Sequence, residues 1–151
     1  MSRTPDIDTS FVDDILPVFI SEANESLLRV DDKQELFEES CRIAVDLGGV
    51  TMAWVGSIND EKSVKAVAWY GHEDGYLNNT EMSTDENNTL GKGPTGRAIR
   101  SRKYSFCNDI ASDPLMLPWR NEALKRRYFS SISYPILVND KVKAVFTMYV
   151  S

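Results

Sequence analysis

The stretch TMAWVGSI at residues 51–58, followed by SVKAVAWY at residues 63–70, decides the fold class of this chain. Apolar side chains recur in both runs with a period close to two, which is typical of β-strands. The connection Asn59-Asp60-Glu61-Lys62 is made of polar residues that favour tight turns. Together the two runs and their connection predict an antiparallel hairpin.

A second hairpin is predicted at the end of the chain. Residues 130–138 and 142–150 have the same strand pattern, and Asn139-Asp140 between them is a good hairpin turn. Pro135 has no backbone N–H to donate, so we expect a bulge or an unpaired amide there. A shorter strand is predicted at 104–108. Because hairpins pair neighbouring strands in opposite directions, the sheet is expected to be largely antiparallel.

One long helix is predicted before the first hairpin. Residues 32–47 carry apolar side chains at helical spacing. Asp32 and Glu35 read as a capping box at its start, and Gly48-Gly49 reads as its stop. A long helix beside an antiparallel sheet places the chain in the α+β class.

Shorter elements are predicted in the second half of the chain. Helices are expected at residues 95–101, where Pro94 stands at the start, and at residues 119–127. Residues 71–93 form a long polar connection, which is expected to contain a short strand or a helical turn near residues 81–84.

Composition excludes several classes of function. The chain has 151 residues, with 17 Lys and Arg against 23 Asp and Glu, and a net charge of −6. An acidic chain of this kind is not expected to bind nucleic acid or anionic lipid. No apolar run is long enough to span a bilayer, and residues 1–6 do not resemble a signal peptide, so a cytoplasmic location is expected.

Cysteine and histidine are scarce, which limits metal and redox chemistry. Cys41 and Cys107 are too few for a disulfide framework, and a single histidine, His72, excludes a site of several histidines. Buried inert thiols are commoner than a reactive pair, and a lone histidine beside loop acids is more often solvated than a ligand. No catalytic or metal-ligating residue is therefore assigned.

The segment Gly91-Lys92-Gly93-Pro94-Thr95-Gly96 has the spacing of a dinucleotide-binding loop. A dinucleotide fold needs a buried apolar strand before this loop, whereas residues 84–89 are polar. Pro94 also removes one amide from any phosphate cradle. The glycines are therefore interpreted as shaping a turn into a short helix.

Aromatic residues are the best candidates for a small-molecule pocket. Trp and Tyr offer an apolar face with a polar tip, although core packing accounts for most of them. Asp109 and Arg120 are candidates for the few polar groups that such a pocket needs. The predicted ligand-binding residues are Trp54, Trp69, Tyr70, Asp109, Ile110, Trp119, Arg120 and Tyr134.

Two stretches carry a resemblance to a known family. One is ELFEESCRIAV at residues 35–45, leading through GGV to MAWVG at residues 52–56. The other runs from LGKGPTGRA at residues 90–98 through NDIASDP at residues 108–114 to PWR at residues 118–120. Over roughly residues 33–150 the chain resembles a GAF domain of bacterial signalling proteins, of the type placed before diguanylate cyclase, phosphodiesterase or histidine kinase modules.

The resemblance implies a six-stranded antiparallel sheet flanked by helices, with a ligand pocket on one face. It places Asp109, Ile110, Trp119 and Arg120 near the rim of this pocket and Trp54 at its floor. It does not name the cofactor. Neither cysteine is followed by the histidine that often follows the bilin-attaching cysteine, so no bilin is expected, and haem is disfavoured because only His72 could bind it.

The expected organisation is a tail and helical arm at residues 1–32, followed by the GAF domain at residues 33–151. An apolar stripe on the arm suits pairing with a second copy, since the helix at residues 32–47 is expected to cover the sheet already. The expected partners are thus a small-molecule ligand and a second copy of this chain. The stripe consists of Val12, Ile15, Phe19, Ala23, Leu27 and Val30.

The function expected from this resemblance is regulatory rather than catalytic. A small ligand would bind, and helices in a dimer would transmit the signal to an output module that is absent from this chain. Two alternatives stay open. One is a ligand-free dimerisation and relay module, with a filled core. The other is a cysteine-dependent redox enzyme of the same fold, which needs an acidified thiol at Cys41 or Cys107.

Overall fold

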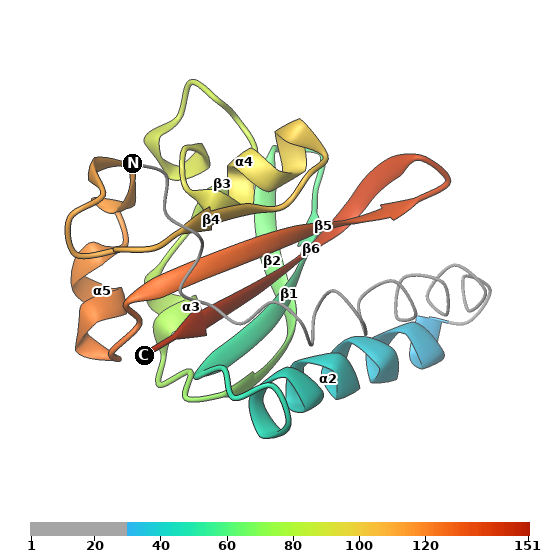
Figure 1. Cartoon of the computed structure of the whole chain (residues 1–151). Coiled ribbons are helices and arrows are strands. Elements are labelled where there is room, and N and C mark those ends of the chain that lie inside the picture. Colours follow the sequence, from blue (N-terminus) through green and yellow to red (C-terminus); the bar gives the residue numbers. More distant parts are fainter. Residues whose placement is uncertain (1–29) are drawn as a thin grey trace.

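The computed structural model describes residues 30–151, so the predicted tail and helical arm at residues 1–32 lies outside the described residues except for residues 30–32. The described part is built on one six-stranded sheet in the order β3-β2-β1-β6-β5-β4 (Figure 1). Every pair of neighbouring strands is antiparallel, which confirms the α+β class and both hairpins. The strands are β1 (Met52–Ile58), β2 (Ser63–Gly71), β3 (Met82–Ser83), β4 (Ser105–Cys107), β5 (Ser130–Val138) and β6 (Lys141–Val150).

Helix α2 (Val30–Asp46) precedes the sheet and differs from the prediction at its start. The predicted beginning at Asp32 is wrong, because Val30 is already helical and the two aspartates lie inside the helix. Asp is only a moderately poor helix former, so two of them do not compel a break. The predicted end is confirmed: Gly49 has a φ of 77° and donates its N–H to Val45 O.

The sheet separates two cores. On one face α2 packs over β1 and β2, which is only part of that face. The expectation that this helix covers the sheet, which supported pairing of the arm with a second copy, is therefore met only in part. The largest buried side chains of this first core are Phe37, Ile132, Tyr134, Ile136, Phe146 and Met148.

The opposite face is covered by short elements that the long middle loops provide (Figure 1). Its second core contains more aromatic side chains than the first. The covering elements are α3 (Tyr76–Asn79), η1 (Thr89–Gly91), α4 (Pro94–Ser101), η2 (Pro114–Met116) and α5 (Arg120–Lys125). The largest buried side chains of the second core are Met52, Trp54, Tyr76, Trp119, Tyr128 and Tyr149.

Several boundaries differ from the predictions. Helix α5 is shorter than the predicted 119–127, because Arg127 takes a φ of 63° and the chain turns Tyr128 into the second core. Strand β4 is shorter than 104–108 by one residue at each end. The predicted strand near 81–84 is confirmed as β3, and the bulge expected at Pro135 falls one residue further, between Ile136 and Leu137.

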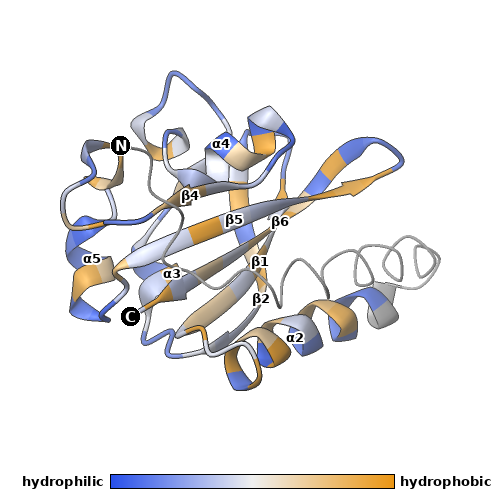
Figure 2. Cartoon of the chain, in the orientation of Figure 1, coloured by the Kyte–Doolittle hydropathy of each residue, from blue (hydrophilic) through white to orange (hydrophobic). Residues whose placement is uncertain are grey.

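Hydropathy follows this architecture. Figure 2 shows hydrophobic residues concentrated on the strands and hydrophilic residues on the loop before α4 and on the β5–β6 turn. Within residues 30–151, no helix has the length and apolar character needed to cross a membrane.

The glycine-rich segment turns into α4 as predicted. Gly93 is the N-cap of α4 and Pro94 begins the helix, which fixes φ for the first turn. Gly96 lies against the backbone of two other segments: a Cβ there would sit 2.8 Å from Ser83 O and even closer to Gly91 O. The glycine therefore lets η1, β3 and α4 approach closely, a packing role that the sequence interpretation did not include.

We expect Gly96→Ala to lower the free energy of unfolding by about 2–3 kcal/mol, because overpacking against backbone atoms cannot relax. In an exposed helix the same change stabilises the protein by about 1 kcal/mol, so a loss of stability in Gly96→Ala would identify overpacking. Gly49→Ala is the control: its φ of 77° is strained for alanine, at about 1–2 kcal/mol, but nothing lies within 4 Å of the added Cβ. Urea unfolding of both variants tests this, and a Gly96→Ala variant as stable as wild type contradicts the packing role.

Candidate functional site

A pocket lies between the sheet and the short elements of the second core, and we call it the tyrosine pocket. Strands β5 and β6 supply its floor, α3 and α4 its walls, and the segments around η1, η2 and α5 its roof. Its lining residues are Tyr76, Met82, Leu90, Gly93, Pro94, Thr95, Gly96, Met116, Trp119, Ser131 and Tyr149.

The tyrosine pocket is closed in this structure. Its cavity volume is about 10 Å³, which leaves room for one water molecule at most. Its lining contains no charged side chain. The pocket is thus an apolar space with a few hydroxyl groups, and any ligand larger than water requires its roof to move.

Three tyrosines pack at the inner end of the pocket. The rings of Tyr128 and Tyr149 are stacked with centroids 4.6 Å apart, and Tyr76 meets both edge-on at 5.0 and 5.3 Å. Edge-on and offset contacts between aromatic rings stabilise such a cluster beyond the area that it buries. All three side chains are almost completely buried.

The three tyrosine hydroxyls differ in their hydrogen bonds. Tyr149 Oη accepts from Trp54 Nε1 at 3.2 Å, and Tyr128 Oη donates to His72 O. The hydroxyl of Tyr76 is buried next to that of Tyr149, yet it makes no hydrogen bond of good geometry. Burial raises the pKa of Tyr149 to about 12 and that of Tyr76 well above its ordinary value, so both stay protonated and neutral at neutral pH.

Arg126 holds the outer side of this cluster. Its side chain is 6% exposed, and its guanidinium lies over the Tyr76 ring at 5.7 Å from the centroid. The same guanidinium donates to the carbonyl oxygens of Glu73 and Asp74 and forms an ion pair of 2.7 Å with Glu122. Arg126 therefore links the loop before α3 to α5, and its charge is compensated by Glu122 and the two carbonyl oxygens.

Trp119 closes the roof. Its indole Nε1 donates to Glu81 O at 2.8 Å, which ties the start of α5 to the segment before β3. Gly93 lies directly against the ring, since a Cβ there would stand 2.6 Å from it. Opening the roof would therefore break this hydrogen bond and separate Trp119 from Gly93.

A group of buried hydroxyls lies beside the pocket. Thr95 on α4, Ser133 on β5 and Thr147 on β6 form a closed triangle, with Oγ–Oγ distances of 3.1, 3.1 and 2.8 Å. Each hydroxyl can donate to one neighbour and accept from the other, so the group is satisfied without water. The triangle fastens α4 to the sheet.

The predicted site residues are distributed over the whole fold. Trp54, Ile110 and Trp119 come together in the second core, and Trp119 lines the pocket itself. Trp54 borders an adjoining cavity of about 30 Å³. Tyr134 belongs to the first core, on the opposite face of the sheet. Trp69 and Tyr70 lie on β2, where 50% and 37% of each side chain is exposed, in a groove beside α2.

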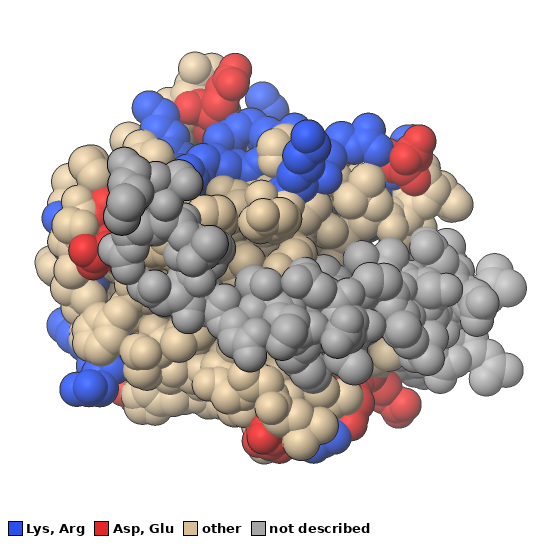
Figure 3. All heavy atoms as spheres, viewed as in Figure 1, with Lys and Arg blue, Asp and Glu red and all other residues tan. Residues whose placement is uncertain are grey.

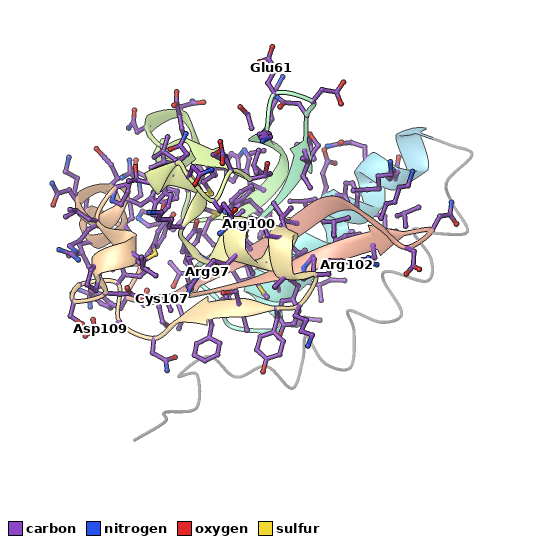
Figure 4. All side chains as sticks on the ribbon, turned by 90° about the horizontal axis from the view of Figure 1, so that it is seen from above. Glu61, Arg97, Arg100, Arg102, Cys107 and Asp109 are labelled. Carbon is purple, nitrogen blue, oxygen red and sulfur yellow. The ribbon has the colours of Figure 1, made fainter. Side chains whose placement is uncertain are left out.

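Two polar candidates hold a loop rather than face the pocket. Arg120 donates to Ile110 O at 3.2 Å and to Asp113 O at 2.8 Å. Asp109 is exposed and accepts a hydrogen bond from Ser112 Oγ. Figure 4 shows Asp109 just after β4, close to Cys107. These contacts fix the path of residues 109–113, the segment that leads into η2.

The two thiols are far from a reactive arrangement. Cys41 belongs to the first core and Cys107 to the second, so the sheet stands between them. Burial raises the pKa of each thiol from 9.0 to about 12. His72 is exposed, and no group of three or more His, Cys, Asp or Glu residues in the described part of the chain could hold a metal ion.

Sequence reasoning included Trp119 but missed the two tyrosines that line the pocket, Tyr76 and Tyr149. Tyr149 could have been found, because Val145, Thr147 and Tyr149 alternate on β6 and must share one face. Tyr76 carried a weaker signal: it stands with Leu77 as the apolar part of a polar connection. Nothing in the local sequence indicates that its hydroxyl would be buried.

The matched family model and solved structures agree with the fold. The model of the GAF domain matches residues 30–151. No curated protein matches the chain. Among solved structures, the GAF domain region of a putative membrane protein from Geobacter sulfurreducens is 15% identical, with a TM-score of 0.63, and the match covers 83% of this chain and 80% of that one.

Two further structures share the fold. The NreA protein of Staphylococcus aureus, mutated in its nitrate binding site, is 13% identical with a TM-score of 0.58, over 83% of this chain and 87% of its own. The free methionine-R-sulfoxide reductase of Neisseria meningitidis, in complex with its substrate, is 11% identical with a TM-score of 0.63, over 99% and 81%. At these identities the likeness concerns the fold alone. Together with the family model, which spans most of the sequence, it shows that this chain belongs to the GAF domain family.

Proposed function

We propose that this chain is a sensory GAF domain that binds a small neutral ligand in the tyrosine pocket. The observation that carries the proposal is the buried Tyr76 hydroxyl, which has no hydrogen-bond partner of good geometry. A buried polar group without a partner is costly, and native proteins keep few of them. A ligand with a hydrogen-bond acceptor would give this hydroxyl its partner.

The pocket lining defines the class of ligand. No charged side chain lines the pocket, and the nearby guanidinium of Arg126 is engaged by Glu122 and two carbonyl oxygens. Burial of an ionised ligand without a counter-charge is strongly unfavourable. The aromatic and sulfur-containing walls favour a flat apolar body. The ligand is therefore a small neutral molecule, aromatic or heterocyclic, with one acceptor that faces Tyr76.

Binding requires a second conformation, because the closed pocket has a volume of only about 10 Å³. The hydrogen bond from Trp119 to Glu81 O and the contact with Gly93 are the interactions that opening would break. A ligand shifts this equilibrium only by its difference in affinity for the two states. Movement of the roof loops would shift β1 and β6, and through these strands α2 and the preceding arm. In a dimer of this chain, the arms would transmit this change to an output module.

A ligand-free relay module is the second candidate, and the filled pocket favours it. In that case the second core is a permanent packing unit, and the chain contributes rigidity and dimerisation through its arm. A cysteine-dependent redox enzyme is a weaker candidate, because both thiols are buried, have raised pKa values and lie on opposite faces of the sheet.

Native mass spectrometry of gently purified protein separates the first two candidates. We expect a dimer that carries a small adduct, which is lost on denaturation and in Trp119→Ala. As a probe of ligand charge, benzamide should raise the melting temperature more than benzoate, which has a similar shape but carries a charge. Protein without an adduct, combined with no response to benzamide, phenol or indole, would favour the relay module.

Two conservative variants test the Tyr76 hydroxyl directly. We expect Tyr76→Phe to leave the free energy of unfolding unchanged or to raise it by about 1 kcal/mol, because it removes a buried group without a partner. Tyr128→Phe is the matched control, and it should lower the free energy of unfolding by about 1 kcal/mol because its hydroxyl donates to His72 O. If Tyr76→Phe were as destabilising as Tyr128→Phe, the hydroxyl would already be satisfied and the main support for a ligand would be lost.

Thiol reactivity tests the redox candidate. At pH 8 we expect both cysteines to react slowly with a disulfide reagent in the native protein and rapidly in denaturant, because burial raises both pKa values to about 12. The unfolded chain ionises these thiols near pH 9, so their contribution to stability is present below pH 9 and is lost as the pH rises toward 12. Rapid native modification of Cys107 at pH 8 would revive the redox candidate.

A further inference from the structure

A second depression lies outside the tyrosine pocket, between α2 and the outer strand β2. We call it the α2–β2 groove; its volume is about 850 Å³. On the α2 side it is lined by Glu35, Leu36, Glu38, Glu39 and Arg42, and on the β2 side by Val67, Ala68, Trp69 and Tyr70.

The strand side of this groove is an unpaired sheet edge. In the described part of the chain, β3 pairs only with Ser63 and Val64, at the beginning of β2. Residues 65–71 have β1 on one side and no strand on the other. Within residues 30–151, a side chain reaches this outer side at one point, where Gln34 Nε2 donates to Val67 O at 2.6 Å. An exposed edge of this kind is a template for pairing with another extended segment.

The aromatic side chains beside this edge are unusually exposed. Trp69 is 50% exposed and Tyr70 is 37% exposed, whereas Trp54 and Trp119 are 2% and 3% exposed. Neither is needed to fill a core in this position. Trp69 is the cross-strand partner of Trp54 and so lies on the second-core face of the edge, whereas Tyr70 lies on the α2 face, where its hydroxyl donates to Asp46 at 3.4 Å. A strand added at this edge would therefore meet an exposed aromatic side chain on each of its faces.

The helix side of the groove is strongly acidic. Helix α2 contains six acidic and two basic residues, and so accounts for −4 of the net charge of −6. Arg42 is already paired with Glu39 and Asp46. Within the described residues, Glu35 and Glu38 form no ion pair, and Glu38 only accepts from Gln34. Figure 3 shows acidic side chains over α2, with a basic one beside them, and mainly basic side chains over α4.

We propose that the α2–β2 groove binds an extended, cationic peptide segment of a partner protein. The segment adds a strand along residues 65–71 of β2, and its main chain supplies hydrogen bonds that the edge lacks. Because side chains alternate along a strand, basic residues at every second position can face Glu35 and Glu38. The charges select a cationic segment and the strand edge selects an extended one.

A short peptide of alternating lysine and valine is the probe, and Trp69 is the reporter, since it is the exposed one of three tryptophans. We expect the peptide to protect Trp69 from quenching by acrylamide. The double variant Glu35→Lys/Glu38→Lys should weaken the affinity by about tenfold or more. The control is Glu61→Lys/Glu86→Lys, which makes the same change of charge on exposed residues outside the groove. It should weaken binding by less than about threefold, because it reduces only the long-range attraction between the acidic chain and the peptide, which salt screens.

Two modified peptides complete the test. A peptide of alternating glutamate and valine should not bind, and a lysine–valine peptide with alternate amides N-methylated should lose most of its affinity, because it keeps its charge but cannot pair with a strand. The proposal is overturned if the N-methylated peptide binds as well as the parent. It is also overturned if both double variants weaken binding equally. Tyr76→Phe should leave peptide binding unchanged, so this test is independent of the tyrosine pocket.

Discussion

The position of β6 between β1 and β5 is the constraint on which both cores depend. β6 is the last strand in the sequence, yet it pairs with β1, the first, on one side and with β5 on the other. This pairing sets Met52 beside Tyr149 and Trp54 beside Thr147, so that the indole of Trp54 reaches the hydroxyl of Tyr149. One residue of slip would move every side chain of β6 to the opposite face. The tyrosine pocket and the first core would then both lose their floor.

The two faces of this sheet are covered in different ways, and the difference bears on function. The first core is covered over β1 and β2 by a regular helix, α2. The second core is covered by short helical turns joined by loops, and specific contacts hold these loops in place: Arg126 to the loop before α3, Trp119 to Glu81, and Gly96 against η1. Such a covering consists of short segments that share an apolar core and are held in place by a few specific contacts, rather than of one regular helix. It is therefore the part of the fold in which a small ligand can most easily change the structure.

The outer surface shows a second kind of site, which is separate from the buried one. The tyrosine pocket is closed and uncharged, whereas the α2–β2 groove is open, acidic and bordered by an unpaired strand edge. The first suits a small neutral molecule that must displace its roof. The second suits a macromolecular segment that binds without opening the core. Because α2 forms one wall of the groove and also packs on β1, a partner in the groove would contact a helix that adjoins the sheet between the two cores.

Local sequence patterns determined the elements of this protein, and tertiary structure decided the site. Alternation, turn residues and helical spacing are local properties, so the hairpins, α4 and the end of α2 could be predicted from residues that are neighbours in the chain. The family motifs added the six-stranded sheet. Tyr134 and Trp54 both looked like pocket residues, yet they lie on opposite faces, because the face of a strand residue depends on its register with strands far away in the sequence. The burial of the Tyr76 hydroxyl beside that of Tyr149 and the open edge of β2 likewise depend on which distant groups arrive beside them, and only the folded chain decides this.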